Sequence, residues 1–137
     1  MVEKSGFREF DHTADWGIEV WARDLFGLLE TAARGMFSLL AVQRGEGNRS
    51  DFNFHLDEQQ DHEDLLVEFL SELLFLSEQH QVAFDHFDLI SEGGRIQVAA
   101  HGYPIVGQRK EIKAVTYYGL SVDRTENGLE TKIVFDV

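Results

Sequence analysis

The sequence lacks cysteine, has a single proline among its 137 residues and contains no long apolar run. Without cysteine, disulfides and thiolate metal sites are excluded, which is typical of a protein from a reducing compartment. No stretch approaches the roughly 20 apolar residues that a membrane-spanning helix needs, and the first residues have no apolar core of a signal peptide. We therefore expect a cytoplasmic protein that does not contact a membrane.

Basic residues are also scarce. The chain has 12 Lys and Arg residues against 25 Asp and Glu residues, which gives a formal net charge of −13. Nucleic-acid backbones are bound by patches of Lys and Arg, so we expect no direct nucleic acid binding. An acidic surface can attract a basic protein partner and accelerate its encounter, or it can simply maintain solubility. The composition leaves both alternatives open.

Common catalytic motifs are absent as well. The chain has no Walker loop, no G-x-S-x-G, no H-E-x-x-H and no EF-hand pattern, and its six histidines have no zinc-binding spacing. We interpret all of them except His12 as ordinary surface or strand residues. These five are His55, His62, His80, His86 and His101.

What is present suffices for one hydrophobic core, since 43% of the residues are hydrophobic. Apolar residues recur at helical spacing over residues 24–40 and 61–81, which predicts two amphipathic helices, the first capped by Asp24. Alternating apolar residues predict strands over residues 6–12, 16–22, 51–57, 82–90, 94–102, 111–125 and 129–137, with residues 103–110 as a loop. This order favours a single α+β domain over residues 1–137, a two-layer sandwich with both helices packed on one face of a largely antiparallel or mixed sheet.

Two carboxylates are candidate ligands of a cation. Asp15 ends the polar segment "HTAD", which begins at His12 and precedes an apolar strand, and Asp136 is the penultimate residue. A carboxylate among apolar neighbours needs water, a partner or a cation. If the last strand ends beside this segment, Asp15, Asp136 and the Val137 terminus offer the oxygen ligands that Ca²⁺ or Mg²⁺ prefers. A turn cap and a strand-end charge are the alternatives. Lys113, in "EIKAVTYYGL", is either a solvated charge or a functional contact.

Three segments together resemble the archease family: "FDHTADWGIEVWARDLFGLLETAARGMFSLL", "EIKAVTYYGL" and the terminal "IVFDV". The resemblance covers nearly the whole chain and keeps the order of the motifs. Archease is a small accessory protein of the RNA-splicing ligase that joins tRNA halves and other RNA ends. The resemblance therefore implies a non-enzymatic activator that promotes guanylylation of the ligase and multiple turnover.

The resemblance also implies a cation site. In the family, the aspartate of H-T-A-D and the penultimate aspartate ligate a divalent cation, typically Ca²⁺, with Mg²⁺ or Mn²⁺ as alternatives. Carried over to this chain, the ligands are Asp15 and Asp136, with Val137 as a further ligand. His12 and Lys113 are expected to be functional contacts with the partner, and no catalytic residue is expected.

Two residues depart from the family pattern. Tyr118 stands where the family commonly has histidine, and Trp16 stands where a smaller aliphatic residue is usual. Two other functions also remain open from the residues themselves. One is a metal-dependent hydrolase or phosphotransferase, in which Asp15 and Asp136 hold a catalytic cation and His12 is the general base. The other is a chaperone-like binding module for a different partner.

Overall fold

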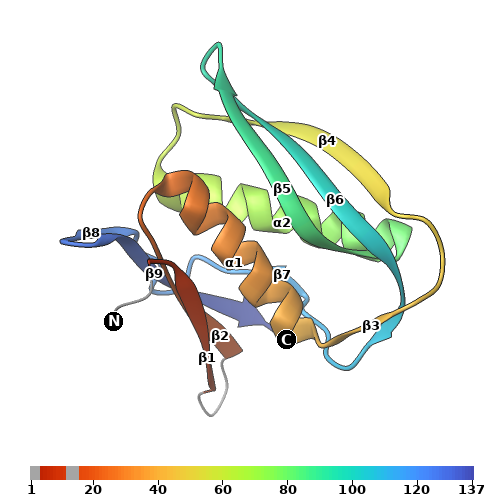
Figure 1. Ribbon diagram of the computed structural model, residues 1–137. Coiled ribbons are helices and arrows are strands. Elements are labelled where there is room, and N and C mark those ends of the chain that lie inside the picture. The colour runs from red at the N-terminus through yellow and green to blue at the C-terminus, as the bar shows by residue number, and fades with distance from the viewer. Residues whose placement is uncertain (1–3, 12–15) are drawn as a thin grey trace.

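The strands form two antiparallel sheets in the computed structural model, which describes residues 4–11 and 16–137 (Figure 1). The first sheet has the strand order β1-β2-β9-β7, and β8 also pairs with β9. Its strands are β1 (Gly6–Asp11), β2 (Trp16–Ala22), β7 (Ala114–Val115), β8 (Asp123–Thr125) and β9 (Gly128–Asp136). The second sheet has the order β3-β6-β4, and β5 pairs with β6. Its strands are β3 (Val42–Arg44), β4 (Ser50–Asp57), β5 (Val82–Glu92) and β6 (Arg95–Gln108).

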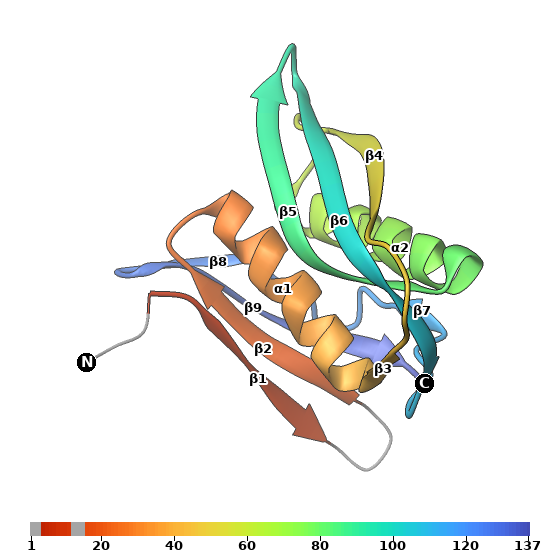
Figure 2. The same cartoon turned by 45° about the vertical axis from the view of Figure 1, so that its right-hand side comes forward.

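Two helices pack against each other, and each contacts strands of both sheets (Figure 2). Helix α1 (Leu25–Leu40) lies on β1 and β2 and also contacts β5, whereas α2 (His62–His80) lies on β4 and β5 and also contacts β7. Most of α1 is buried, and its exposed residues Arg34 and Ser38 are four positions apart. The predicted α+β sandwich of two helices and antiparallel strands is confirmed, with the strands divided between two sheets.

Local sequence explains where α1 begins and how closely it packs. Asp24 is the N-cap, as predicted, and its carboxylate accepts a hydrogen bond from the backbone N–H of Gly27 at 2.8 Å. A Cβ atom at Gly35 would lie 2.8 Å from Cδ1 of Ile18 and 3.1 Å from Cγ of Phe7. The absence of a side chain at this position therefore lets α1 lie close to β1 and β2.

The prediction of a loop over residues 103–110 is wrong, because β6 continues through Pro104 to Gln108. Proline has no backbone N–H to donate to a neighbouring strand, but its carbonyl oxygen still accepts a hydrogen bond from the N–H of Gly45 at 2.8 Å. Pro104 also pairs with Val82 of β5, so the strand pairing includes the one residue that suggested a break.

The prediction of one strand over residues 111–125 is also wrong. Only β7 and β8, at either end of this range, pair with β9. Between them, Gly119 has a φ of +61°, a conformation that favours glycine and interrupts an extended strand.

The core is a cluster of apolar side chains contributed by both helices and both sheets. Phe69, Phe84 and Phe135 are among its largest fully buried members. Because Phe135 immediately precedes Asp136, the core holds the end of the last strand in place. Of the helices in the described part of the chain, neither is long and apolar enough to cross a membrane.

Candidate functional site

The segments that carry the predicted site meet at one end of the first sheet. The last residues of β9 lie between β2 and β7, where Trp16 pairs with Phe135 and Ala114 pairs with Asp136 (Figure 1). Trp16 is the residue that directly follows the "HTAD" segment. The chain terminus, the start of β2 and the segment containing Lys113 are therefore neighbours, although they are far apart in the sequence.

His12 and Asp15 lie outside the described residues, so their part of the site stays a prediction. The other three predicted residues are described and are exposed: Lys113, Asp136 and Val137. The backbone N–H of Lys113 donates a hydrogen bond to the carbonyl oxygen of Asp136 at 2.7 Å. The structure thus brings these three residues together, with their side chains accessible to a ligand or a partner.

Trp16 borders this end of the sheet and has a basic neighbour. The Nζ atom of Lys110 lies 3.5 Å from the centroid of the Trp16 ring, which is a cation–π contact. The indole is also partly buried against the core. The residue that departs from the family pattern in size therefore makes a contact that a smaller aliphatic side chain cannot make.

The segment after β7 is tied to β9 and to the start of α2. The backbone N–H and the Oγ1 hydroxyl of Thr116 both donate hydrogen bonds to the carbonyl oxygen of Val134, at 3.1 and 2.8 Å. The hydroxyl of Tyr117 donates to Oδ1 of Asp64 at 2.9 Å, and this hydrogen bond raises the pKa of Tyr117. Tyr118, at the position where the family commonly has histidine, is 72% exposed. Its phenol is thus available to a partner.

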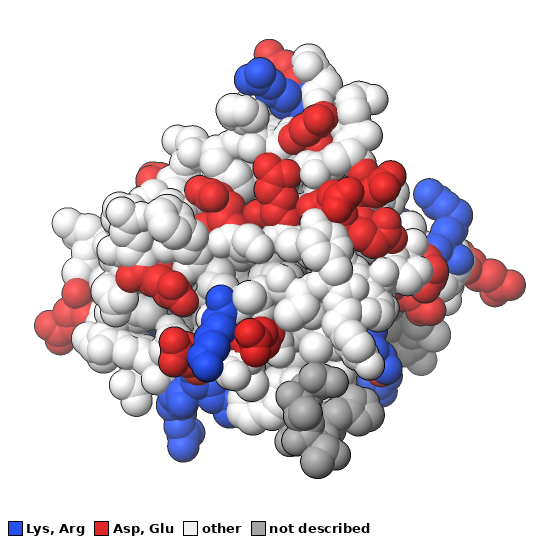
Figure 3. All heavy atoms as spheres, turned by 180° about the vertical axis from the view of Figure 1, so that it is seen from behind, with Lys and Arg blue, Asp and Glu red and all other residues white. Residues whose placement is uncertain are grey.

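Acidic side chains form a band across one face of the molecule, with few basic ones among them (Figure 3). Helix α2 lies behind β5 and β6 in Figure 1, so it is on the side that Figure 3 shows. The helix and its N-cap carry Asp61, Glu63, Asp64, Glu68, Glu72 and Glu78. Part of the excess negative charge of the chain therefore lies on this face.

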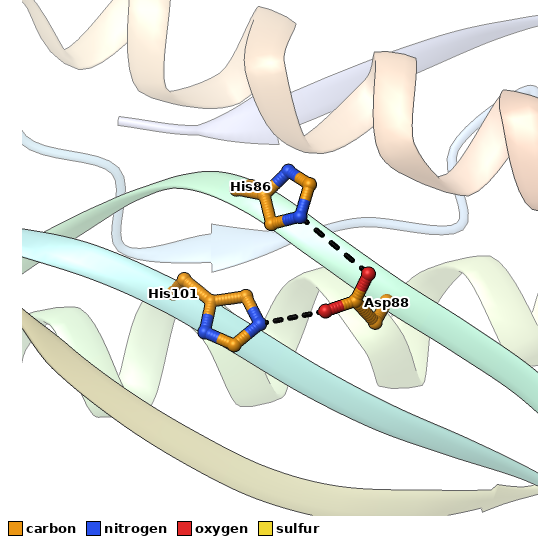
Figure 4. A group of neighbouring side chains, drawn as sticks. All are labelled: His86, Asp88 and His101. Carbon is orange, nitrogen blue, oxygen red and sulfur yellow. Dashed lines mark hydrogen bonds and ion pairs between the residues drawn. The ribbon is translucent and has the colours of Figure 1, made fainter.

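A second group of polar side chains, which the sequence interpretation missed, lies on the exposed face of the second sheet (Figure 4). His86 and Asp88 come from β5 and His101 comes from β6, and one potential ligand atom of each lies within 4.8 Å of the others. The interpretation of His86 and His101 as ordinary strand residues overlooked this grouping. The available signal was the spacing of His86 and Asp88, since residues two apart in a strand share a face.

Hydrogen bonds give this group a distinct electrostatic character. Nδ1 of His101 lies 2.6 Å from Asp51 Oδ1, and Nε2 lies 2.8 Å from Asp88 Oδ2. These two contacts, with Asp51 first, raise the pKa of His101, and the hydrogen bond with His101 lowers the pKa of Asp88. On the adjacent α1, burial raises the pKa of Glu30, whose carboxyl also feels the charges of His86 and Asp88. Imidazoles and carboxylates thus interact across four elements, which are β4, β5, β6 and α1.

Comparison with known proteins identifies the family. The family model described as the archease protein family matches residues 7–137. Relatives named protein archease are 29% identical in Methanosarcina barkeri and 31% identical in Methanosarcina acetivorans, and each alignment covers 96% of this chain and 95% of the relative.

Two solved structures have the same fold at 24% sequence identity. The solution structure of Methanobacterium thermoautotrophicum protein 1598 has a TM-score of 0.68 and is matched over 96% of this chain and 99% of that one. The crystal structure of an archease, possible chaperone, from Thermotoga maritima has a TM-score of 0.69, with 95% and 96% coverage. With a family model that spans the chain from Phe7 to its last residue, this protein belongs to the archease family.

Proposed function

We propose that the protein is a non-enzymatic accessory protein that activates an RNA-splicing ligase, promoting guanylylation of the ligase and multiple turnover. Family membership supports an accessory role, and the Thermotoga maritima protein of the same fold is described as a possible chaperone. The observation that carries the proposal is the strand pairing at the end of β9. This pairing makes neighbours of the three segments on which the family resemblance rests. We propose that the ligase binds at this end of the molecule.

Asp15, Asp136 and the Val137 terminus are the proposed ligands of a divalent cation, with Ca²⁺ preferred over Mg²⁺ or Mn²⁺. Consecutive Cα atoms are about 3.8 Å apart, so Asp15 is one such step from Trp16, whose strand partner precedes Asp136. Carboxylate and backbone oxygen atoms are the ligands that Ca²⁺ takes. These residues would hold the ion between the end of β9 and the segment that leads into β2.

The charge distribution supports a protein partner with a basic surface. A ligase that handles RNA must present positive charge to the phosphate backbone. The acidic band is complementary to such a surface and does not attract RNA itself. Lys113 and His12 are proposed contacts at the edge of this interface, where Lys113 is exposed beside Asp136.

The test is multiple-turnover RNA ligation by the cognate ligase, with and without this protein and Ca²⁺. The wild-type protein should increase the number of turnovers, and Asp15→Asn and Asp136→Asn should each abolish most of the increase. Asp123→Asn is the matched control, because Asp123 is an exposed carboxylate on β8 of the same sheet. Full stimulation by both variants would overturn the cation site, and no stimulation by the wild type would overturn the ligase function. Metal-dependent turnover of a phosphoester by the purified chain would favour the hydrolase alternative.

A further inference from the structure

The cluster on the exposed face of the second sheet, formed by His86, Asp88 and His101, is positioned by strand register. His86 pairs with His101 across β5 and β6, and Asp88 follows on the same face of β5. A register shift between Phe84 and His86 leaves Asp85 as an extra residue. Because of this bulge, Asp85 and His86 are both exposed between the buried Phe84 and Phe87. The bulge therefore determines that His86 and Asp88 lie on the outer face, beside His101.

The side chains in this cluster direct their ligating atoms toward one another (Figure 4). Nε2 of His86 lies 3.5 Å from Asp88 Oδ1, and Nε2 of His101 lies 2.8 Å from Asp88 Oδ2. The two imidazole centroids are 5.2 Å apart with their planes inclined by 31°. Both Nε2 atoms thus face a single carboxylate, and the three ligand atoms lie within 4.8 Å of one another.

A further carboxylate fixes the orientation of one imidazole. Oδ1 of Asp51, on β4, lies 2.6 Å from Nδ1 of His101 and can accept a hydrogen bond from it. Asp88 contacts the other ring nitrogen, Nε2. Histidines that bind metals almost always donate their other ring N–H to a carboxylate, a backbone carbonyl or water, which fixes the tautomer and raises the basicity of the ligand. His101 already has this arrangement, since Nδ1–H can stay on Asp51 while Nε2 exchanges its proton for an ion.

The surrounding charge favours a cation. Asp51 and Asp88 flank His101, and Glu30 of α1 is close enough to feel the charges of His86 and Asp88. Of the basic residues nearby, Arg49 forms an ion pair with Asp85, outside the cluster, and Arg34 of α1 acts on the carboxyl of Glu30. Two neutral histidines do not compensate the negative charge of these carboxylates. A divalent ion bound between the imidazoles would therefore compensate part of it.

We propose that His86, Asp88 and His101 bind a divalent transition metal ion of the zinc class through two Nε2 atoms and one carboxylate oxygen. This site is separate from the oxygen-ligand site at the end of β9. Imidazole nitrogen suits Zn²⁺, Cu²⁺ and Ni²⁺, whereas Ca²⁺ and Mg²⁺ prefer oxygen. Three protein ligands leave a coordination position for water.

Binding requires only a local adjustment of side chains. Ligand atoms around a tetrahedral zinc ion are about 3.3 Å apart, given bonds of about 2.0 Å, so the widest separation in the cluster must shorten. The side chain of His86 is 62% exposed and that of Asp88 is 58% exposed, which leaves both free to change rotamer. The ion can also enter from solvent without any opening of the fold.

The test is titration of the chelator-treated protein with Zn²⁺, monitored by calorimetry and by the NMR signals of the imidazole rings. The wild type should bind one equivalent, with shifts of the rings of His86 and His101. His86→Ala and His101→Ala should each weaken binding at least about 100-fold, because loss of even an outer-shell partner weakens metal binding about 10–100-fold. Asp51→Asn should weaken it about tenfold and leave the ring of His86 responsive to Zn²⁺.

The matched control is His55→Ala, since His55 is an exposed histidine on β4 of the same sheet and lies outside the cluster. This variant should bind Zn²⁺ as the wild type does. Circular dichroism checks that each variant is folded, and the exposed His86 provides a test that does not depend on the fold tolerating the loss of His101. The proposal is overturned if His86→Ala retains wild-type affinity, or if the wild type binds no Zn²⁺ at about 1 mM.

Discussion

The end of β9 and the outer face of the second sheet each gather polar side chains, but they do so in different ways. At the end of β9, the residues belong to motif segments that can be recognised in the linear sequence, and the ligand atoms proposed for them are oxygens. On the second sheet, a bulge and a strand pairing bring together two histidines and an aspartate that match no motif. A sequence motif thus reveals the first region, whereas only the register of the strands reveals the second.

The largest expected effect is a separation of the two regions by metal type. Asp136→Asn should weaken Ca²⁺ binding at least about 100-fold and leave Zn²⁺ binding unchanged, because it removes the negative charge of a proposed ligand from one region only. His101→Ala should have the reverse effect. Calorimetric titration of both variants with both metals measures this directly. If either variant lost affinity for both ions, the two regions would not be independent sites.

The next largest effect is on the free energy of unfolding, and it depends on the close approach of β2 to β9. Gly17 is buried in β2, and a Cβ atom there would overlap the carbonyl oxygen of Ile133 and the ring of Phe10. Gly17→Ala should therefore lower the free energy of unfolding by about 2 kcal/mol or more. In the matched control Gly107→Ala, on β6, the added Cβ lies 3.4 Å from Oε1 of Gln43, which is ordinary contact with a flexible side chain. Urea unfolding of the two variants compares the costs, and equal losses would contradict the close approach of β2 and β9.

Much of the architecture could be predicted because it depends on local patterns. The spacing of apolar residues gives both helices, and the short acidic side chain of Asp24 marks where α1 begins. Pro104 led to the wrong prediction that β6 ends before residue 103. The effect of a proline on a strand depends on whether a neighbouring strand requires a hydrogen bond from that position. Local pattern carries no information about those neighbours.

The candidate sites show the same limit more clearly. The pairing of Trp16 with Phe135 and of Ala114 with Asp136 joins residues more than 20 positions apart, so no local pattern specifies it. The family resemblance supplied that connection instead. For the histidine cluster no resemblance was available, and a shift of register by one residue would move a whole strand's side chains to the other face. The bulge at Asp85 is a shift of this kind.

A smaller effect is the pH dependence of the stability that His101 contributes on the second sheet. The hydrogen bonds of His101 to Asp51 and Asp88 raise its pKa in the folded protein. A histidine with a folded-state pKa above the unfolded value of about 6.5 stabilises the fold fully below that pH, and the contribution is lost as the pH rises through the folded-state pKa. His101→Gln should therefore cost more stability at about pH 5.5 than at about pH 8.5. Urea unfolding in metal-free buffer tests this, with His55→Gln as the control, and an equal cost at both pH values would contradict it.

The smallest effect compares one cation–π contact from each sheet. Lys110 lies 3.5 Å from the ring centroid of Trp16 beside the end of β9, and Arg44 lies 4.3 Å from that of Tyr103 on the second sheet. A double-mutant cycle of Lys110→Met and Trp16→Leu, measured by urea unfolding, should give a coupling energy of about 0.5–1 kcal/mol. The matched cycle of Arg44→Met and Tyr103→Leu should give less, because its cation is farther from the ring. A coupling near zero for Lys110 and Trp16 would mean that the indole is held by the core alone. In that case the large residue at this position would be explained by packing, and the lysine would be free to contact a partner.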